Sequence, residues 1–194
     1  MKTSISHGAA RRLLPLLILP LASLAMAQQH AHTHGQLTLD VAIDAQTLTV
    51  TMEAPLDNFL GFERAPRTDA ERKSVAALVK RLAAADKLFI PDPRAECRLS
   101  NVTLESETLG LIPGQHATKA ADVAAQTPAA HDEHADIDVS IVFNCAKAPL
   151  ARQLEVGMFD AFPRLRSIDA QVASAQGQYK RSLTKTASTL RWGR

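Results

Sequence analysis

The chain has 194 residues, of which 46% are hydrophobic and 22% are charged, a composition typical of a globular protein with a buried core. Its 22 Lys and Arg residues nearly balance 20 Asp and Glu residues, for a formal net charge of +2. The sequence has no basic stripe with interleaved aromatic residues, so it does not indicate nucleic-acid binding.

The first 27 residues have the pattern of a cleavable export signal. Lys2, Arg11 and Arg12 form a positive region, an apolar run follows, and Ala25-Met26-Ala27 has the form of a cleavage site. The apolar run contains prolines and is too short for a bilayer span of about 20 residues, so an uncleaved anchor is the weaker alternative. We expect a periplasmic mature chain of residues 28–194, in which 19 basic residues remain against 20 acidic ones, for a net charge of −1.

Three histidines, His30, His32 and His34, lie at alternate positions directly behind this cleavage site. Neutral imidazole is a common ligand for zinc, copper and nickel, and three imidazoles so close in sequence can converge on one ion. The alternative is a solvated polar leader without a function, because short His-rich tracts are first of all a compositional signal. The cluster predicts a metal site near the amino terminus of the mature protein.

Alternating apolar residues predict a β-hairpin behind the histidines. Two runs, 37–43 and 48–52, alternate apolar with polar or small residues, and Asp44-Ala45-Gln46 interrupts the pattern. Because residues i and i+2 lie on the same face of a strand, an early strand start would direct the histidines away from the core. They would then be accessible to a metal ion.

The hairpin is followed by a loop and a helix. Residues 55–67 show no clear period and are expected to form an ordered loop packed on the core. Thr68-Asp69-Ala70-Glu71 then has the pattern of a capping box, in which Thr68 accepts from the third backbone amide and Glu71 reaches back. A helix should follow and end before Pro91, with four residues on its buried face: Val75, Leu78, Val79 and Leu82.

Two cysteines, Cys97 and Cys145, each lie at an end of a predicted strand. In an oxidising compartment, an even pair is better explained by a disulfide than by a thiolate metal site, for which a close Cys-x-x-Cys pair is missing. Between them, residues 112–133 are rich in Ala, Gly, Gln, Thr and Pro and predict an exposed, flexible insertion. A second cluster with ligand chemistry, His131, His134 and Asp136, then leads into a strand that alternates from Ile137 to Cys145.

The last part of the chain predicts a strand at 154–158, a turn or short helix at 160–165 and a closing three-stranded meander at 168–173, 178–183 and 188–192. The predicted fold class is α+β. We expect a single domain with an antiparallel β-sheet, built from hairpins and the C-terminal meander, and one main α-helix.

Five motifs occur in a distinctive order: His32-Thr33-His34-Gly35 at a strand start, Gly61-Phe62-Glu63-Arg64-Ala65-Pro66, Leu88-Phe89 before Cys97, His134-Ala135-Asp136 before Phe143-Asn144-Cys145, and Phe159-Asp160-Ala161-Phe162-Pro163. Together they resemble the ZrgA-like family of zinc-regulated periplasmic zinc-binding proteins, over nearly the whole mature chain. The resemblance implies a zinc-binding, non-enzymatic role in zinc acquisition, in support of an ABC-type zinc importer and its solute-binding protein.

Two departures from the family pattern bear on the site. Where the family tends to have histidine after Gly-Phe-Glu, this chain has Arg64, whose guanidinium stays protonated and has no free lone pair for zinc. The family's long insertion, rich in His and Asp, is reduced here to an Ala-rich segment with His116, His131 and His134. We therefore expect a lower capacity for weakly held ions.

Carried over residue by residue, the resemblance favours a zinc site of His32, His34, His134 and Asp136, with His30, His131 and Glu63 in reserve. Three imidazoles and a carboxylate suit tetrahedral zinc. The geometry is plausible if the strand that starts at Gln36 lies beside the strand that starts at Ile137, about 4.8 Å away, and this adjacency is assumed. The alternative is that Glu63 pairs with Arg64 or Arg67, and that the second cluster is only a polar strand start.

Three other hypotheses stay open. Cleavage after residue 27 would place Gln28-Gln29-His30 at the amino terminus, where the α-amine, two amide nitrogens and the imidazole suit square-planar Cu(II) or Ni(II). A zinc enzyme is disfavoured, because the sequence has neither a His-Glu-x-x-His nor a Gly-x-Ser-x-Gly motif. A metal-independent adaptor for a transporter component is the third possibility.

Overall fold

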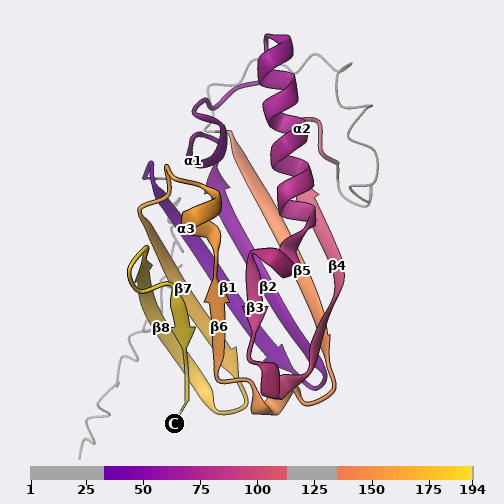
Figure 1. Ribbon diagram of the computed structural model, residues 1–194, viewed down its shortest axis with the longest axis vertical. Coiled ribbons are helices and arrows are strands. Elements are labelled where there is room, and N and C mark those ends of the chain that lie inside the picture. Colours follow the sequence, from indigo (N-terminus) through magenta and orange to yellow (C-terminus); the bar gives the residue numbers. More distant parts are fainter. Residues whose placement is uncertain (1–32, 113–134, 194) are drawn as a thin grey trace, which may run out of the picture. The chain divides into compact units, whose positions relative to one another are not determined.

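Alternating strands pair into a six-stranded sheet in the order β4-β5-β2-β1-β7-β8, and three short strands form a second sheet in the order β3-β6-β9 (Figure 1). The structure is a computed structural model that describes residues 33–112 and 135–193. The strands are β1 (Gln36–Asp44), β2 (Thr47–Pro55), β3 (Phe89–Pro91), β4 (Cys97–Glu105), β5 (Asp136–Cys145), β6 (Gln153–Val156), β7 (Ser167–Ser174), β8 (Gly177–Thr184) and β9 (Thr189–Arg191). The helices are α1 (Asp57–Leu60), α2 (Asp69–Ala83) and α3 (Met158–Ala161), with 3₁₀ turns at Ala85–Lys87, Pro93–Ala95 and Ala148–Leu150.

The predicted hairpin is confirmed, because β1 and β2 are antiparallel and Val41 lies opposite Val50. Its turn is tight, and Ala45 takes a positive φ of 47° there. The α+β class is also confirmed, although the large sheet is mixed: β1 and β7 are parallel, whereas the other neighbouring pairs in it are antiparallel. The three-stranded closing meander was wrong in its last strand, since β9 leaves the β7–β8 hairpin and pairs with β6.

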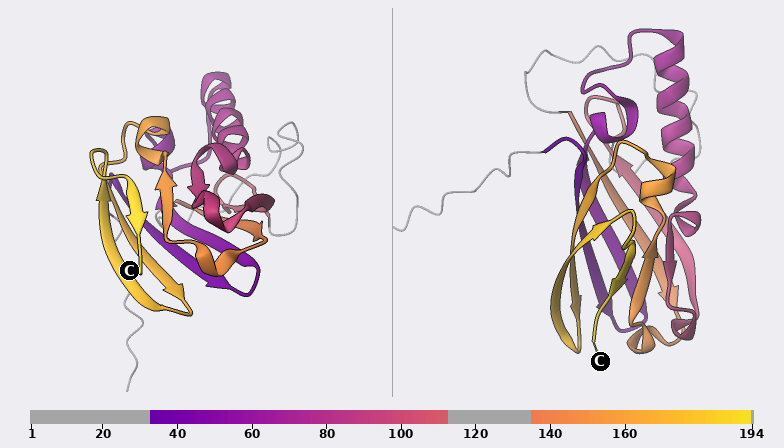
Figure 2. Two further views of the ribbon diagram at one scale, coloured as in Figure 1. Left: turned by 60° about the horizontal axis from the view of Figure 1, so that its bottom comes forward. Right: turned by 60° about the vertical axis from the view of Figure 1, so that its left-hand side comes forward.

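One face of the large sheet forms the core. Every second strand residue points to this face, and Leu39, Val50 and Ile141 are at most 1% exposed there. The helices and the small sheet lie on the same side, which leaves the other face of the large sheet uncovered by described elements (Figure 2). Residues 33–112 and 135–193 therefore form a two-layer structure in which the described helices pack on one side of the sheet.

Helix α2 begins as the sequence predicts. The Thr68 hydroxyl accepts the Glu71 N–H at 3.1 Å, and the Glu71 carboxylate accepts the Thr68 N–H at 3.2 Å, which completes a capping box. Its buried residues are the four predicted ones, Val75, Leu78, Val79 and Leu82, and it ends at Ala83. The preceding segment, 55–67, is more regular than expected, because it contains the short helix α1.

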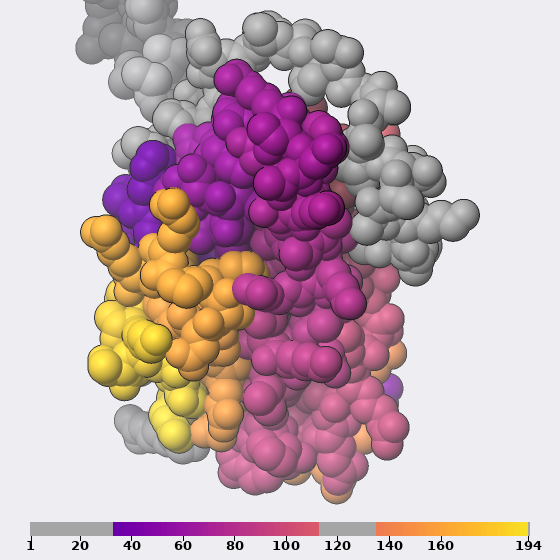
Figure 3. Space-filling view, turned by 45° about the horizontal axis from the view of Figure 1, so that its top comes forward, coloured from indigo at the N-terminus to yellow at the C-terminus, as the bar shows by residue number. Residues whose placement is uncertain are grey.

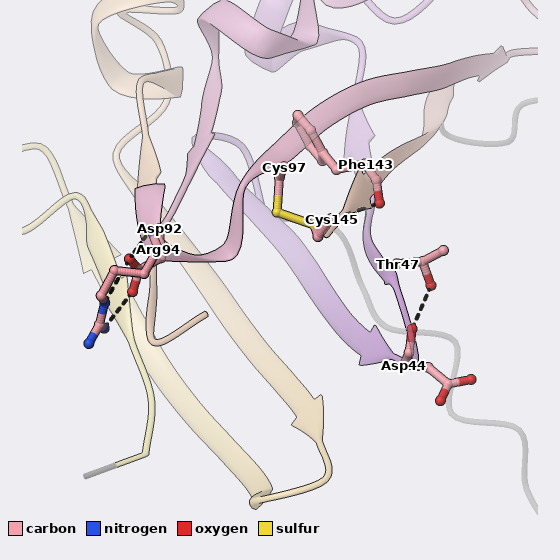
Figure 4. The surroundings of a disulfide bond; sticks show 7 residues. All are labelled: Asp44, Thr47, Asp92, Arg94, Cys97, Phe143 and Cys145. Carbon is pink, nitrogen blue, oxygen red and sulfur yellow. Dashed lines mark hydrogen bonds and ion pairs between the residues drawn. A yellow bond between two sulfur atoms is a disulfide. The ribbon is translucent and has the colours of Figure 1, made fainter. Parts of the chain in front are cut away.

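The predicted disulfide is confirmed. Cys97 and Cys145 lie directly opposite each other in the β4–β5 pair and are joined by an S–S bond (Figure 4). The bond ties the start of β4 to the end of β5, next to the turn that joins β1 and β2, where the Cys145 N–H donates to the Gln46 carbonyl. The disulfide therefore closes the end of the sheet at which β1 finishes.

The predicted signal peptide, residues 1–27, and the insertion from 113 onward lie outside the described residues, and their predictions stay untested. None of the helices in the described ranges is both long enough and apolar enough to cross a membrane.

Replacing Cys97 and Cys145 together by Ala should lower the free energy of unfolding by about 4 kcal/mol, because the bond closes a loop with a sequence separation of 48 residues. Urea unfolding of the oxidised natural protein and of the double variant measures the difference. A change below about 1 kcal/mol would contradict the assigned role of the bond in stability.

Candidate metal site

The candidate site lies at the end of the large sheet where β1 and β5 begin and β2 ends. Antiparallel pairing of β2 with both neighbours brings these three ends together, and Pro55 at the end of β2 lies opposite Asp136 at the start of β5. Figure 3 shows this end of the molecule, with the indigo start of the described chain beside the purple residues that follow it in sequence. From the sequence, the starts of β1 and β5 were expected to lie at the same end of the sheet, and they do. The prediction that β1 and β5 are direct neighbours was wrong, because β2 lies between them.

His34 lies in the turn that leads into β1. The Gln36 N–H donates to the Thr33 carbonyl at 2.9 Å, and Gly35 takes a φ of +83°, which favours glycine. The Gly35 carbonyl accepts the Arg166 N–H at 2.8 Å, and a Cβ on Gly35 would lie 3.2 Å from the Arg166 side chain. The backbone next to His34 is thus held closely against the start of β7, while the His34 side chain itself is 64% exposed.

Asn58 of α1 holds the same turn from the other side. Its Oδ1 accepts the Gly35 N–H at 2.6 Å and its Nδ2 donates to the Gln36 carbonyl at 2.7 Å. The side chain is buried, and both polar ends have partners, as a buried amide requires. The sequence predicted only an ordered loop here, and the role of Asn58 was missed. A polar residue just behind a proline that ends a strand was the signal available.

Glu63 is brought to His34 by the end of α1. The helix stops at Gly61, which takes a φ of +81° and whose N–H donates to the Asp57 carbonyl. The positive φ favours glycine at this position, and a Cβ there would lie 2.6 Å from Nη2 of Arg164 and displace this side chain. Two residues later, Oε1 of Glu63 accepts a hydrogen bond from Nε2 of His34 at 2.9 Å.

Arg64, in the place of the family histidine, has a structural role. Its guanidinium donates to both carboxylate oxygens of Glu71, at 2.7 and 3.1 Å, and lies over the ring of Phe62. Hydrogen bonding from Arg64, and then from the Arg67 N–H, lowers the pKa of Glu71 from its ordinary value of 4.5 to about 2. The alternative named for Glu63 was a pair with Arg64 or Arg67; the carboxylate to which the Arg64 guanidinium donates is that of the helix-capping Glu71.

Of the other predicted ligands, the structure describes only Asp136. Asp136 begins β5, and its carbonyl accepts the Ser106 hydroxyl at 2.7 Å. Four predicted ligands lie outside the described residues: His30, His32, His131 and His134. So does the Gln28-Gln29-His30 segment, on which the copper or nickel hypothesis depends. Within residues 33–112 and 135–193, no three His, Cys, Asp or Glu side chains form a group that could hold a metal ion. The structure therefore brings together one leading candidate, His34, and one reserve, Glu63.

An imidazole and a carboxylate are both ordinary zinc ligands. Two ligands bound at about 2.1 Å to a tetrahedral ion are roughly 3.4 Å apart, so the 2.9 Å between the His34 and Glu63 atoms would have to open only slightly. Zinc would take the place of the proton between the two atoms, with Nε2 offering its lone pair and Nδ1 carrying the proton of the neutral imidazole. The pair can thus supply two ligands to one ion.

Replacing Glu71 by Gln should weaken the fold at neutral pH and reduce the loss of stability in acid. A carboxyl whose pKa is lower in the folded than in the unfolded state stabilises the fold above about pH 4.5, and this contribution disappears as the pH falls toward 2. Thermal unfolding between pH 7 and pH 2 measures both effects, with Glu155→Gln on an exposed position of β6 as the matched control. An unchanged acid profile in the Glu71 variant would contradict the assigned role.

Comparison with known proteins agrees with the order of motifs in the chain. The family model described as ZrgA family zinc uptake protein matches residues 31–192, which include the whole described structure apart from Gly193. A search of curated proteins found no significant match. The match spans most of the chain and contains both His34 and Glu63, and the chain therefore belongs to the ZrgA family of zinc uptake proteins.

Proposed function

We propose that this protein is a periplasmic zinc-binding accessory of zinc uptake, and that His34 and Glu63 are two of its zinc ligands. The family match supports a role in zinc uptake. The observation that carries the site assignment is the 2.9 Å contact between Nε2 of His34 and Oε1 of Glu63. It joins the amino-terminal histidine motif to the Gly-Phe-Glu motif, which lie 29 residues apart in the sequence.

The position of this pair suits an ion that has to be taken up and passed on. His34 is largely exposed and Glu63 is 21% exposed, so an ion bound between them would stay accessible to solvent and to a partner protein. The predicted ligands His32 and His134 precede β1 and β5, whose starts lie at the same end of the sheet. These histidines are the proposed source of the remaining zinc ligands.

A binding role explains these features better than catalysis. A catalytic zinc needs three protein ligands, an open position for water and a shaped cavity for substrate. The His34–Glu63 contact instead lies at the end of the sheet where β1 begins, and the imidazole in it is mostly exposed. The proposal therefore assigns no reaction to the protein.

The proposed partner is the solute-binding protein or another component of an ABC-type zinc importer. Zinc-dependent association with that partner, or transfer of zinc to it, distinguishes an accessory from a metal-independent adaptor. An adaptor would bind its partner with the same affinity in the presence of zinc and of a chelator.

Calorimetric titration of the mature chain 28–194 with zinc tests the assignment. Loss of a residue that only supports a metal ligand weakens metal binding by roughly 10- to 100-fold. His34→Ala removes a proposed ligand itself and should weaken zinc binding by more than this, and Glu63→Gln should weaken it by at least about tenfold. Because the two side chains would bind the same ion, their effects should not add in the double variant.

Glu155→Gln, on the exposed side of β6, is the control for the loss of one carboxylate charge. Zinc binding at natural affinity by a folded His34→Ala variant would contradict the site. Zinc binding absent from the natural protein would contradict the function, and titration of the same sample with copper and nickel would then test the amino-terminal alternative.

A further inference from the structure

The ladder between β1 and β2 is incomplete at the end where the candidate site lies. The last paired residue of β1 on that side is Thr38, and two residues beyond its partner β2 ends at Pro55. Since proline has no N–H, β2 cannot donate a ladder hydrogen bond to β1 at this point. The amide of Asn58 takes the place of the missing peptide group, because it donates to the Gln36 carbonyl and accepts the Gly35 N–H.

This amide is firmly placed. Asn58 is 1% exposed, and loss of either hydrogen bond would leave a buried polar atom without its partner. On the opposite side, the Gly35 carbonyl accepts N–H groups of Arg166 and Ser167. The backbone that directly follows His34 is therefore fixed from both sides.

Asn58 also belongs to the segment that carries the second proposed ligand. It lies in α1, which is capped at its C-terminus by Gly61, and Glu63 follows two residues after this cap. One side chain thus links the backbone beside His34 to the helix that precedes Glu63. Because the His34 ring is mostly exposed, burial alone does little to fix its position.

We propose that Asn58 is a positioning residue of the zinc site, which holds His34 and Glu63 at binding distance before the ion arrives. The proposal rests on the zinc-binding role proposed above for these two residues. A site whose ligands are already assembled loses less conformational freedom on binding, and its affinity is correspondingly higher. Loss of such an outer-shell partner typically weakens metal binding by about 10- to 100-fold.

Two variants test the proposal. Asn58→Ala removes both hydrogen bonds, whereas Asn58→Asp keeps an acceptor for the Gly35 N–H but turns an oxygen toward the Gln36 carbonyl. Both should weaken zinc binding by about 10- to 100-fold. Both should also change the visible absorption bands of bound Co(II), which report ligand geometry and would not respond to a loss of stability alone.

Asp92→Ala is the matched control for loss of a buried polar group. Asp92 is 3% exposed and accepts N–H groups of Arg94 and Arg152. Figure 4 shows it near the disulfide, which lies at the end of the sheet where β1 finishes and not where β1 begins. This variant should lower the free energy of unfolding and leave both the zinc affinity and the Co(II) spectrum unchanged. A folded Asn58→Ala variant with natural zinc affinity and Co(II) spectrum would overturn the proposal.

A measurement on the natural protein keeps the test decisive if the Asn58 variants do not fold. The Gly35 amide should be protected from hydrogen exchange in the zinc-free protein to about the same degree as in the zinc-bound one. An unprotected amide that becomes protected only with zinc would refute assembly in advance. Unchanged zinc affinity in His34→Ala defeats the proposed site itself, whereas an effect of His34→Ala without one of Asn58→Ala defeats only the positioning role.

Discussion

The antiparallel register of β2 with β1 and β5 organises both the core and the candidate site. A shift of one residue would turn the buried faces of β1 and β5 outward, so the core fixes this register. The same register places the start of β1, the end of β2 and the start of β5 at the same end of the sheet. Core packing therefore determines which polar segments meet at the proposed zinc site.

Local patterns predicted those parts of the fold that depend on local chemistry. The β1–β2 hairpin, the capping box of α2, its buried face and the cross-strand disulfide were all predicted correctly, because each follows from residue period, cap chemistry or cysteine usage. The order of strands was not predictable in the same way, since it depends on pairing between distant segments. The parallel β1–β7 pair and the transfer of β9 to the small sheet were missed for that reason. For the site, His34 and Glu63 were both predicted as ligands. Their contact and the supporting role of Asn58 were missed, because both depend on helix α1, which was not predicted from the sequence.

Arg64 supports the loop that carries Glu63. Its guanidinium binds Glu71, the residue that caps α2. The residue after Glu63 is thereby attached to the start of the main helix. In the proposed zinc site, His34 lies at the end of the sheet where β1 begins, and the loop that carries Glu63 is held in place through a helix cap.

Anomalous diffraction at the zinc absorption edge, from crystals of the zinc-bound mature protein, tests the central claim most directly. We expect an anomalous peak within about 2.1 Å of both Nε2 of His34 and Oε1 of Glu63, at the end of the sheet where β1 begins. A fully occupied zinc ion elsewhere, with the His34–Glu63 hydrogen bond intact, would contradict it.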